Sequence, residues 1–304
     1  MTQTEFNAML MAALSDGLPS GYYTSRYNGE EIDNAITKTS QLTGRNLLDN
    51  WYFADPINQR GNTEYPSAGY TIDRWRSNGG TTTIGAGGLS VTAGNVLYQL
   101  FENINLADGI KRTVSYMGAD GNVYSGILTS AYALYGQYEF CYSAGTALYI
   151  RPRAGASPIA AIKLELGDQQ TLASKAVDGT WTLIDPQPNK AEELAKCQRY
   201  QNLMKSGARA IGRTAISVDT SVVAFFPLPV TMRGKPVLSG GASAASNYRI
   251  YTNGTSRTPS AVSVSDICDN GVILNFTIPA GIGVMQAVEA EYSETEVGIL
   301  DANL

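Results

Sequence analysis

The chain has 304 residues and a formal net charge of −5, and it contains no histidine. The absence of histidine excludes the usual Ser/His/Asp and Cys/His nucleophile systems and the commonest transition-metal ligand, while an acidic chain with scattered Lys and Arg lacks the clustered basic face that nucleic acid requires. With 31 Gly, 18 Tyr and only 16% charged residues, the composition favours strands and turns over long helices.

The three cysteines predict neither a metal site nor a disulfide framework. Cys141, Cys197 and Cys268 are far apart, odd in number and without a CxxC pair, so we expect them to be small buried side chains in a chain made in a reducing cytoplasm. The N-terminus lacks the pattern of a signal peptide, and no window approaches the roughly 20 apolar residues of a membrane span. We therefore expect no cofactor, no metal, no membrane insertion and no nucleic-acid partner.

Residues 1–44 resemble an anchor. Residues 4–16 place Phe6, Met9, Leu10, Ala13 and Leu14 at helical spacing, and Gly17 and Pro19 end the pattern. A second short helix is predicted over 30–39. A helix of this length is marginal alone in water, so its apolar stripe is expected to be buried against another copy or another protein.

From Arg45 to about Gly167 the apolar period changes to two, which predicts an antiparallel β-sandwich. The stretch Asn46 to Trp75 is expected to hold the opening strand and the turn into the next, with Trp75 in the core. Further strands are expected over 96–101, 111–116, 123–129, 135–142, 147–151 and 160–166, with turns at Asp108-Gly109, Asp120-Gly121-Asn122, Ser143-Ala144-Gly145 and Gly155 to Pro158. Residues 168–189 form a connector.

Residues 190–304 are expected to hold a linker helix and a second β-domain. Lys190 to Lys205 has acidic residues in its first turn, where the helix dipole favours them. Strands are predicted over 215–218, 221–226, 236–239, 248–251, 261–267, 271–278 and 285–292. The segments Gly240 to Asn247 and Thr252 to Pro259 are rich in turn-forming residues and are predicted to be exposed loops.

Three stretches carry a resemblance to a known family. They are Asn46-Leu47-Leu48 to Asp73-Arg74-Trp75, then Lys163 to Gly167 followed by Ala191 to Tyr200, and finally Phe226-Pro227-Leu228-Pro229-Val230 with Met232-Arg233 and Pro236. In this order they resemble tail-fibre and receptor-binding proteins of tailed bacteriophages that contain a carbohydrate-binding-module-like jelly roll. The segment from Tyr27 to Asp33 is similar to the attachment end of phage fibres. At Trp51 and Tyr52 the chain departs from the family's small or polar turn residues.

The resemblance implies a structural appendage of a virion, on the tail, baseplate or another surface, made in the host cytoplasm. Residues 1–44 would attach it to other phage structural proteins, residues 45–189 would be the jelly roll, and residues 190–304 the linker helix and C-terminal β-domain. Phage fibres are usually threefold, so a homotrimer is implied. The expected ligand is a host cell-surface polysaccharide.

Aromatic side chains are the expected glycan contacts, because sugars present apolar C–H faces that stack on rings. The candidates are Trp51 and Tyr52, beside the Asp49-Asn50 turn, and Tyr248 and Tyr251, which flank the C-terminal loops. Each of these rings could instead fill a core or a subunit interface.

Three further functions stay open. A glycosidase or depolymerase needs two carboxylates across a cleft, and the candidate acids are Asp55, Glu64, Asp73, Glu102, Glu139 and Glu165. None forms a spaced pair and the chain shows no internal repeat, so we expect no enzyme; Asp120-Gly121-Asn122 is expected to be a hairpin turn rather than a calcium loop. The chain could also be a sugar-binding module of a bacterial surface protein, or a head or collar fibre without a receptor role.

Overall fold

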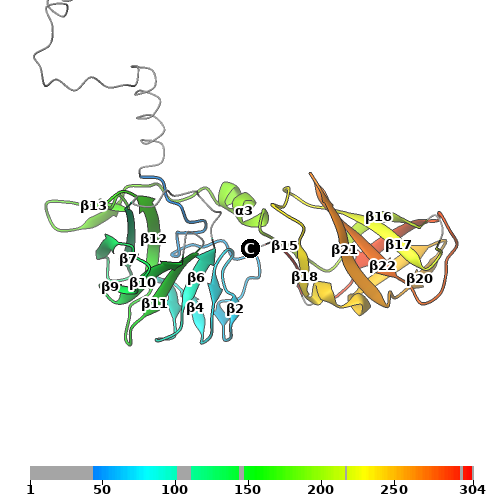
Figure 1. Cartoon of the computed structure of the whole chain (residues 1–304), viewed down its shortest axis with the longest axis horizontal. Helices are drawn as coiled ribbons and strands as arrows, with labels where there is room; N and C mark the ends of the chain where they lie inside the picture. The colour runs from blue at the N-terminus through cyan, green and yellow to red at the C-terminus, as the bar shows by residue number, and fades with distance from the viewer. Residues whose placement is uncertain (1–43, 101–110, 144–146, 216–217, 295–296, 303–304) are drawn as a thin grey trace, which may run out of the picture. The chain divides into compact units, whose positions relative to one another are not determined.

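The computed structural model describes residues 44–100, 111–143, 147–215, 218–294 and 297–302. The described chain is mainly β, as the sequence predicts, and it contains two separate hydrophobic cores (Figure 1). Within the described ranges, no helix combines the length and the apolar character needed to cross a bilayer. The helices predicted over 4–16 and 30–39 lie outside the described residues.

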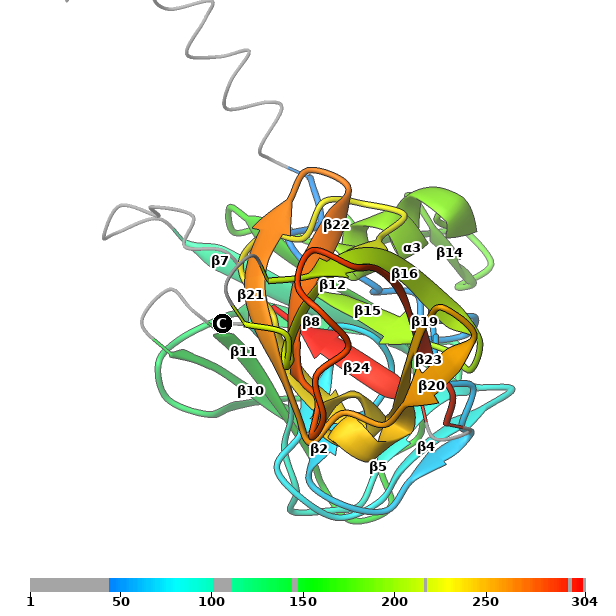
Figure 2. The same ribbon diagram turned by 90° about the vertical axis from the view of Figure 1, so that its right-hand side faces the viewer.

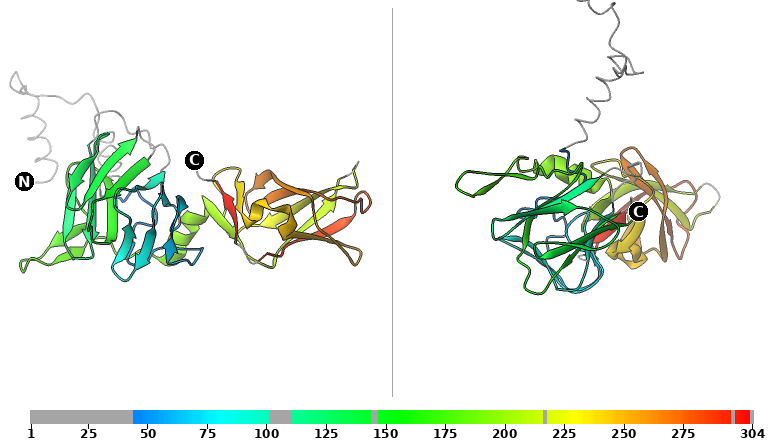
Figure 3. Two further views of the ribbon diagram at one scale, coloured as in Figure 1. Left: turned by 90° about the horizontal axis from the view of Figure 1, so that it is seen from below. Right: turned by 60° about the vertical axis from the view of Figure 1, so that its left-hand side comes forward.

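The first core lies between two six-stranded antiparallel sheets (Figure 3). One sheet has the order β1 (Glu64–Tyr65), β4 (Thr82–Gly85), β5 (Gly88–Val91), β12 (Ile159–Leu166), β7 (Arg112–Gly118) and β8 (Val123–Ile127). The other has the order β2 (Gly69–Tyr70), β3 (Arg76–Ser77), β6 (Leu97–Leu100), β11 (Ala147–Pro152), β10 (Tyr138–Ser143) and β9 (Ala133–Tyr135).

The chain passes repeatedly from one sheet to the other, from β5 to β6, from β6 to β7, from β8 to β9 and from β11 to β12. Alternate side chains of each strand point into the space between the sheets, where Trp75, Phe140, Leu148 and Ile162 are buried. The predicted antiparallel sandwich and the predicted core position of Trp75 are confirmed.

The stretch from Asn46 to Trp75 was expected to begin with a strand, and this expectation is wrong. Its first part is irregular backbone that lies along β12, with Leu47 N donating to Leu164 O at 2.8 Å and Ile162 N donating to Trp51 O at 3.0 Å. Asn50, at a positive φ of 52°, turns the chain there. Its side-chain amide donates to the carbonyls of Ile57 and Asp73. Side-chain hydrogen bonds therefore replace a regular ladder.

A hairpin of β13 (Ala173–Lys175) and β14 (Trp181–Leu183) follows β12. Beside it, two charged side chains of β12 are buried, Lys163 and Glu165. Lys163 Nζ donates to Asp185 Oδ2 at 2.6 Å, and Glu165 accepts from the backbone N–H of Thr171 at 2.7 Å. Each buried charge thus has a partner, as burial requires.

The linker helix α3 spans Lys190–Gln198. Asn189 caps its N-terminus by accepting from Ala191 N, and Glu192 and Glu193 occupy the first turn. The predicted extension to Lys205 is wrong, because Gln201–Met204 form strand β15. Two of the three cysteines, Cys141 and Cys197, are buried as predicted, Cys268 is half-buried, and all three are free thiols.

The second core lies between a three-stranded and a seven-stranded antiparallel sheet (Figure 2). The smaller sheet has the order β15, β24 (Gly298–Asp301) and β18 (Val237–Gly240). The larger has the order β20 (Thr255–Arg257), β19 (Tyr248–Thr252), β23 (Ala287–Tyr292), β16 (Ala208–Thr214), β17 (Ser221–Pro227), β22 (Gly271–Thr277) and β21 (Ala261–Cys268).

The segment from Gly240 to Asn247 is not an exposed loop. It forms two short 3₁₀ helices, η1 (Gly241–Ser243) and η2 (Ala245–Asn247), and Ala242 is fully buried in the second core. A small residue fits there because Gly298 of β24 passes close by. Thr252 to Pro259 does reach the surface, although Thr255–Arg257 forms β20.

Candidate functional site

A row of aromatic side chains crosses the outer face of the sheet that contains β6 and β11. Tyr70 pairs with Arg76, Arg76 with Tyr98, and Tyr98 with Tyr149. Residues directly opposite each other on antiparallel strands carry their side chains on the same face of the sheet. We call these four residues, which come from β2, β3, β6 and β11, the tyrosine row.

Strand alternation places the row outside the core. In β6, Leu97 and Gln99 are buried while Tyr98 is half-buried, and in β11 Leu148 and Ile150 are buried while Tyr149 is half-buried. The inward residues are fixed by the hydrophobic core, so their neighbours must point away from it. The tyrosines of the row are therefore accessible by the same pattern that builds the sandwich.

The members of the row contact one another. The rings of Tyr98 and Tyr149 are stacked with centroids 5.6 Å apart. The guanidinium carbon of Arg76 lies 4.8 Å from the ring centroid of Tyr70 and 5.9 Å from that of Tyr98. Cation–π contacts at such distances hold a flat guanidinium and a ring against each other, so the row is a continuous stack of planar groups.

The row continues over β10. Cys141 is opposite Tyr149 in the sheet, and Tyr132, which is 39% exposed, lies beside it. A hollow of about 420 Å³ opens here, lined by Ser130, Tyr132, Cys141, Tyr142, Ser143 and Tyr149. Partial burial of Tyr132, together with its hydrogen bond to Cys141, raises its pKa to about 12, so its hydroxyl keeps its proton at neutral pH.

Two further arginines border this end of the row. Arg151 lies over Tyr132, with its guanidinium carbon 4.0 Å from the ring centroid. Glu139 binds Arg151 at 2.6 Å and Arg153 at 2.9 Å, and hydrogen bonds from these arginines lower the pKa of Glu139. One carboxylate thus serves two guanidinium groups.

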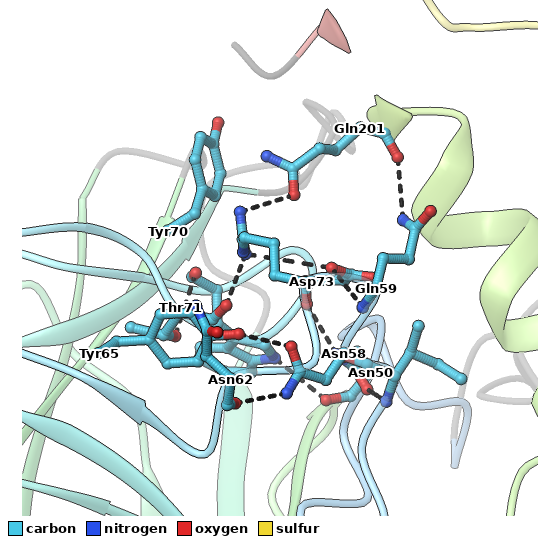
Figure 4. A network of polar contacts seen from close by, with 12 residues as sticks. Asn50, Asn58, Gln59, Asn62, Tyr65, Tyr70, Thr71, Asp73 and Gln201 are labelled. Atoms are coloured by element: carbon cyan, nitrogen blue, oxygen red, sulfur yellow. Dashed lines mark hydrogen bonds and ion pairs between the residues drawn. The ribbon is translucent and has the colours of Figure 1, made fainter. Parts of the chain in front are cut away.

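A polar network positions the other end of the row (Figure 4). Arg60 lies with its guanidinium carbon 5.4 Å from the ring centroid of Tyr70, and it donates to Thr71 O and to the Gln201 side chain. The hydroxyl of Tyr70 donates to Asp301 at 2.9 Å. Strands β15 and β24 of the second β-domain therefore help to hold the first tyrosine of the row in place.

Asp73 is a buried member of this network. Both of its carboxylate oxygens accept from the backbone N–H of Gln59, at 3.3 and 3.4 Å, and Arg60 lies 4.0 Å away. Burial raises the pKa of Asp73 to about 6, although Arg60 and Gln59 lower it in part. Asp73 is fully enclosed, and its carboxylate is held by the backbone of Gln59.

The predicted glycan contacts at Trp51 and Tyr52 are not part of the row. Trp51 is buried in the first core, and the prediction that it meets a ligand is wrong because the enclosing sandwich leaves only 7% of it exposed. Tyr52 is half-buried, packs edge-on against Trp51 and accepts a hydrogen bond from Gln187 at 2.9 Å.

The two predicted contacts in the C-terminal domain differ from each other. Tyr248 is fully buried and donates to Ala242 O at 2.9 Å, so the prediction that it is a surface anchor is wrong. Its neighbour Tyr251 is 37% exposed and lies in a separate hollow of about 810 Å³. Strand alternation separates the two, since Tyr248 points inward and Tyr251, at an odd spacing from it, points outward.

Four of the five candidate acids that the structure describes have ion-pair or hydrogen-bond partners. Glu165 is buried and engaged by Thr171, Glu139 is engaged by two arginines, and Asp55 binds Lys190 at the surface. Glu64 is exposed on the edge strand β1, and Glu102 lies outside the described residues. No cluster of metal-ligating side chains occurs in the described ranges. What this arrangement offers chemically is a row of partly exposed tyrosine rings with arginine side chains between and beside them.

Sequence reasoning missed the row because its members are scattered over four strands. Tyr98 and Tyr149 had a signal, an aromatic at an outward position of a strand with period two, whereas Tyr70 lies in a strand of two residues that shows no such pattern. The pairing that brings these positions together is decided only by the sheet. Comparison of the chain with protein-family models, with curated proteins and with solved structures finds no match.

Proposed function

We propose that the first β-sandwich is a carbohydrate-binding module whose binding face is the tyrosine row. The observation that carries this proposal is the continuous row of partly exposed side chains formed by Tyr70, Arg76, Tyr98 and Tyr149 on one sheet face. Sugar rings bury their C–H faces against aromatic rings, and polar side chains at the edge accept or donate the hydrogen bonds of the hydroxyls.

The chain as a whole is proposed to be an appendage of a tailed-bacteriophage virion that recognises polysaccharide on the host surface. The resemblance of three separated stretches to phage tail-fibre and receptor-binding proteins supports this, and so does a β-sandwich followed by a short helix and a second β-domain. In this proposal residues 1–44 attach the appendage to other structural proteins, and the assembly is a homotrimer.

The proposal assigns no catalytic activity to the chain. Among the described candidate acids, Asp73 and Glu165 are buried in structural contacts, Asp55 and Glu139 are paired with lysine or arginine, and Glu64 is exposed. A polysaccharide that is incubated with the protein for a long time is therefore expected to keep its length, which a sizing column measures.

The binding test uses the full chain and a panel of bacterial surface polysaccharides. Tyr98→Ala and Tyr149→Ala are each expected to weaken binding by about 1 to 3 kcal/mol, the range for an aromatic anchor removed from a binding surface. Tyr251→Ala is the matched control, because this tyrosine is also partly exposed but lies in the other β-domain.

The outcomes separate two sites. Loss of binding in the Tyr98 and Tyr149 variants, with unchanged melting temperature and an unaffected Tyr251 variant, supports the tyrosine row. Loss of binding only in Tyr251→Ala would move the site to the hollow of the C-terminal domain and overturn the assignment to the first sandwich.

A further inference from the structure

Arg76 is placed in the tyrosine row between two rings. By strand register it is opposite Tyr70 on one side and Tyr98 on the other, and its guanidinium carbon lies within 6 Å of both ring centroids, at 4.8 and 5.9 Å. A guanidinium that packs against rings uses its flat face, and its N–H groups point outward in the plane of that face. Such an arrangement orients a cation without neutralising it.

Arg76 also differs from its neighbours in its partners. Among the described residues, Arg151 and Arg153 form ion pairs with Glu139, and Arg74 forms an ion pair with Asp49 at 2.9 Å. No described carboxylate pairs with Arg76, and its Nε is buried without a hydrogen-bond acceptor in the described structure. Because Arg76 has no described carboxylate partner, its charge is available to an anionic ligand that reaches its terminal N–H groups.

The charge around the row also favours a negatively charged ligand. The chain carries a formal net charge of −5, yet Arg76, Arg151 and Arg153 share this face with one paired carboxylate, Glu139. Asp301 contacts Tyr70 at the far end. Local positive charge on an acidic chain attracts an anion to this face while the rest of the surface repels it.

We propose that the ligand of the tyrosine row is an anionic glycan, and that Arg76 binds its charged group while the exposed parts of the flanking rings contact the sugars. This inference rests on the proposed function of the first sandwich. A carboxylate and a phosphate both present paired acceptor oxygens that a guanidinium binds in a bidentate manner. The geometry is thus suited to a polymer with uronic acid residues or phosphodiester links.

The test measures binding of the full chain to three polymers, neutral dextran, polygalacturonate and poly(glycerol phosphate). Wild type is expected to bind one of the charged polymers at least about tenfold more tightly than dextran, with an affinity that falls as salt is raised. Arg76→Gln is expected to remove both the preference and most of the salt dependence. Arg76→Lys, which keeps the charge but loses the bidentate fork, is expected to be intermediate.

Arg153→Gln is the matched control. Arg153 borders the same face and its side chain is 58% exposed, but it already forms an ion pair with Glu139. When Arg153 is replaced, Glu139 still has its ion pair with Arg151. This variant is expected to keep its preference for the charged polymer within about twofold. Equal losses in Arg76→Gln and Arg153→Gln would mean general electrostatic attraction and would overturn the role of Arg76.

The outcomes distinguish this inference from the proposed function. Tight binding of dextran by wild type, lost in Tyr98→Ala and unchanged in Arg76→Gln, would overturn the anionic ligand and leave the glycan-binding row intact. Absence of binding to these polymers and to the wider polysaccharide panel would overturn the proposed function itself. Preference for polygalacturonate assigns a carboxylate to the ligand, and preference for poly(glycerol phosphate) assigns a phosphate.

Discussion

Tyr98 and Tyr149 lie opposite each other on β6 and β11, with their rings stacked at a centroid distance of 5.6 Å on the outer face of the first sandwich. The same two strands bury Leu97 and Ile150 as an opposed pair on the inner face. One strand pairing therefore builds the core on one side and the candidate binding platform on the other.

Tyr98 and Tyr149 are expected to make non-additive contributions to the free energy of unfolding, because their rings stack. A double-mutant cycle with Tyr98→Ala and Tyr149→Ala, measured by chemical denaturation, should give a coupling energy of about 0.5 to 1.5 kcal/mol, the range for aromatic pairs. If the two changes are additive within about 0.3 kcal/mol, the rings do not stack in solution.

Trp75→Ala is expected to destabilise the first sandwich by about 3 to 5 kcal/mol, because truncation of a buried aromatic leaves a cavity. Trp75 is fully buried, packs edge-on against Phe53 at 5.1 Å and donates from its indole N–H to Asn50 O. Any loss of binding should follow unfolding. A variant that keeps the wild-type melting temperature but no longer binds glycan would contradict the core assignment.

Asp73 is expected to make stability depend on pH. Its pKa is raised from 3.8 to about 6 in the folded protein, mainly by burial, so the folded state holds the proton more tightly than the unfolded state. The resulting stabilisation is fully present below about pH 4 and is lost as pH rises through 6, on the order of 3 kcal/mol.

Asp73→Asn carries no titrating group at this position and serves as the comparison. Unfolding free energies of both proteins, measured from pH 4 to pH 8, should show the wild type losing stability relative to the variant as pH rises. A difference between the two that stays constant over this range would show that Asp73 is not perturbed in the folded state.

Lys163 and Asp185 are expected to respond unequally to substitution. Lys163 is 1% exposed in its side chain while Asp185 is 34% exposed, so Asp185→Asn leaves a buried charge without its partner and should cost about 2 to 3 kcal/mol. Lys163→Met replaces the charge by an apolar side chain of similar size and should cost less than about 1 kcal/mol. Chemical denaturation measures the free energy of unfolding of both variants. A larger loss in Lys163→Met than in Asp185→Asn would contradict this account.

Residues 1–44 are expected to attach and trimerise the protein, whereas residues 45–304 carry binding. The full chain should show a trimer mass in light scattering at micromolar concentration. A fragment of residues 45–304 holds both described cores and should bind host cells but not be incorporated into phage particles. A monomeric full chain, or incorporation of the fragment, would contradict the division.

Much of the first sandwich follows from local pattern. Alternation of apolar and polar residues predicts strands over segments such as 111–116 and 160–166, punctuated by Gly and Asp-Gly turns, and β7 and β12 lie there. The core position of Trp75 follows from the same reasoning. The Asn46 to Trp75 stretch did not form its expected first strand, because the side chain of Asn50 and backbone contacts with β12 satisfy its polar groups instead.

The candidate site could not be predicted from local sequence pattern. Sequence alone determined that the chain is rich in tyrosine, mainly β and without histidine, and it identified Tyr251 as a candidate contact and placed Tyr98 within a strand. Only the tertiary structure decided which outward positions meet, since the pairing of β2 with β3, β3 with β6 and β6 with β11 depends on contacts between segments remote in sequence. It also buried Tyr248 and Trp51, because whether an aromatic ring is enclosed depends on what the rest of the fold packs against it.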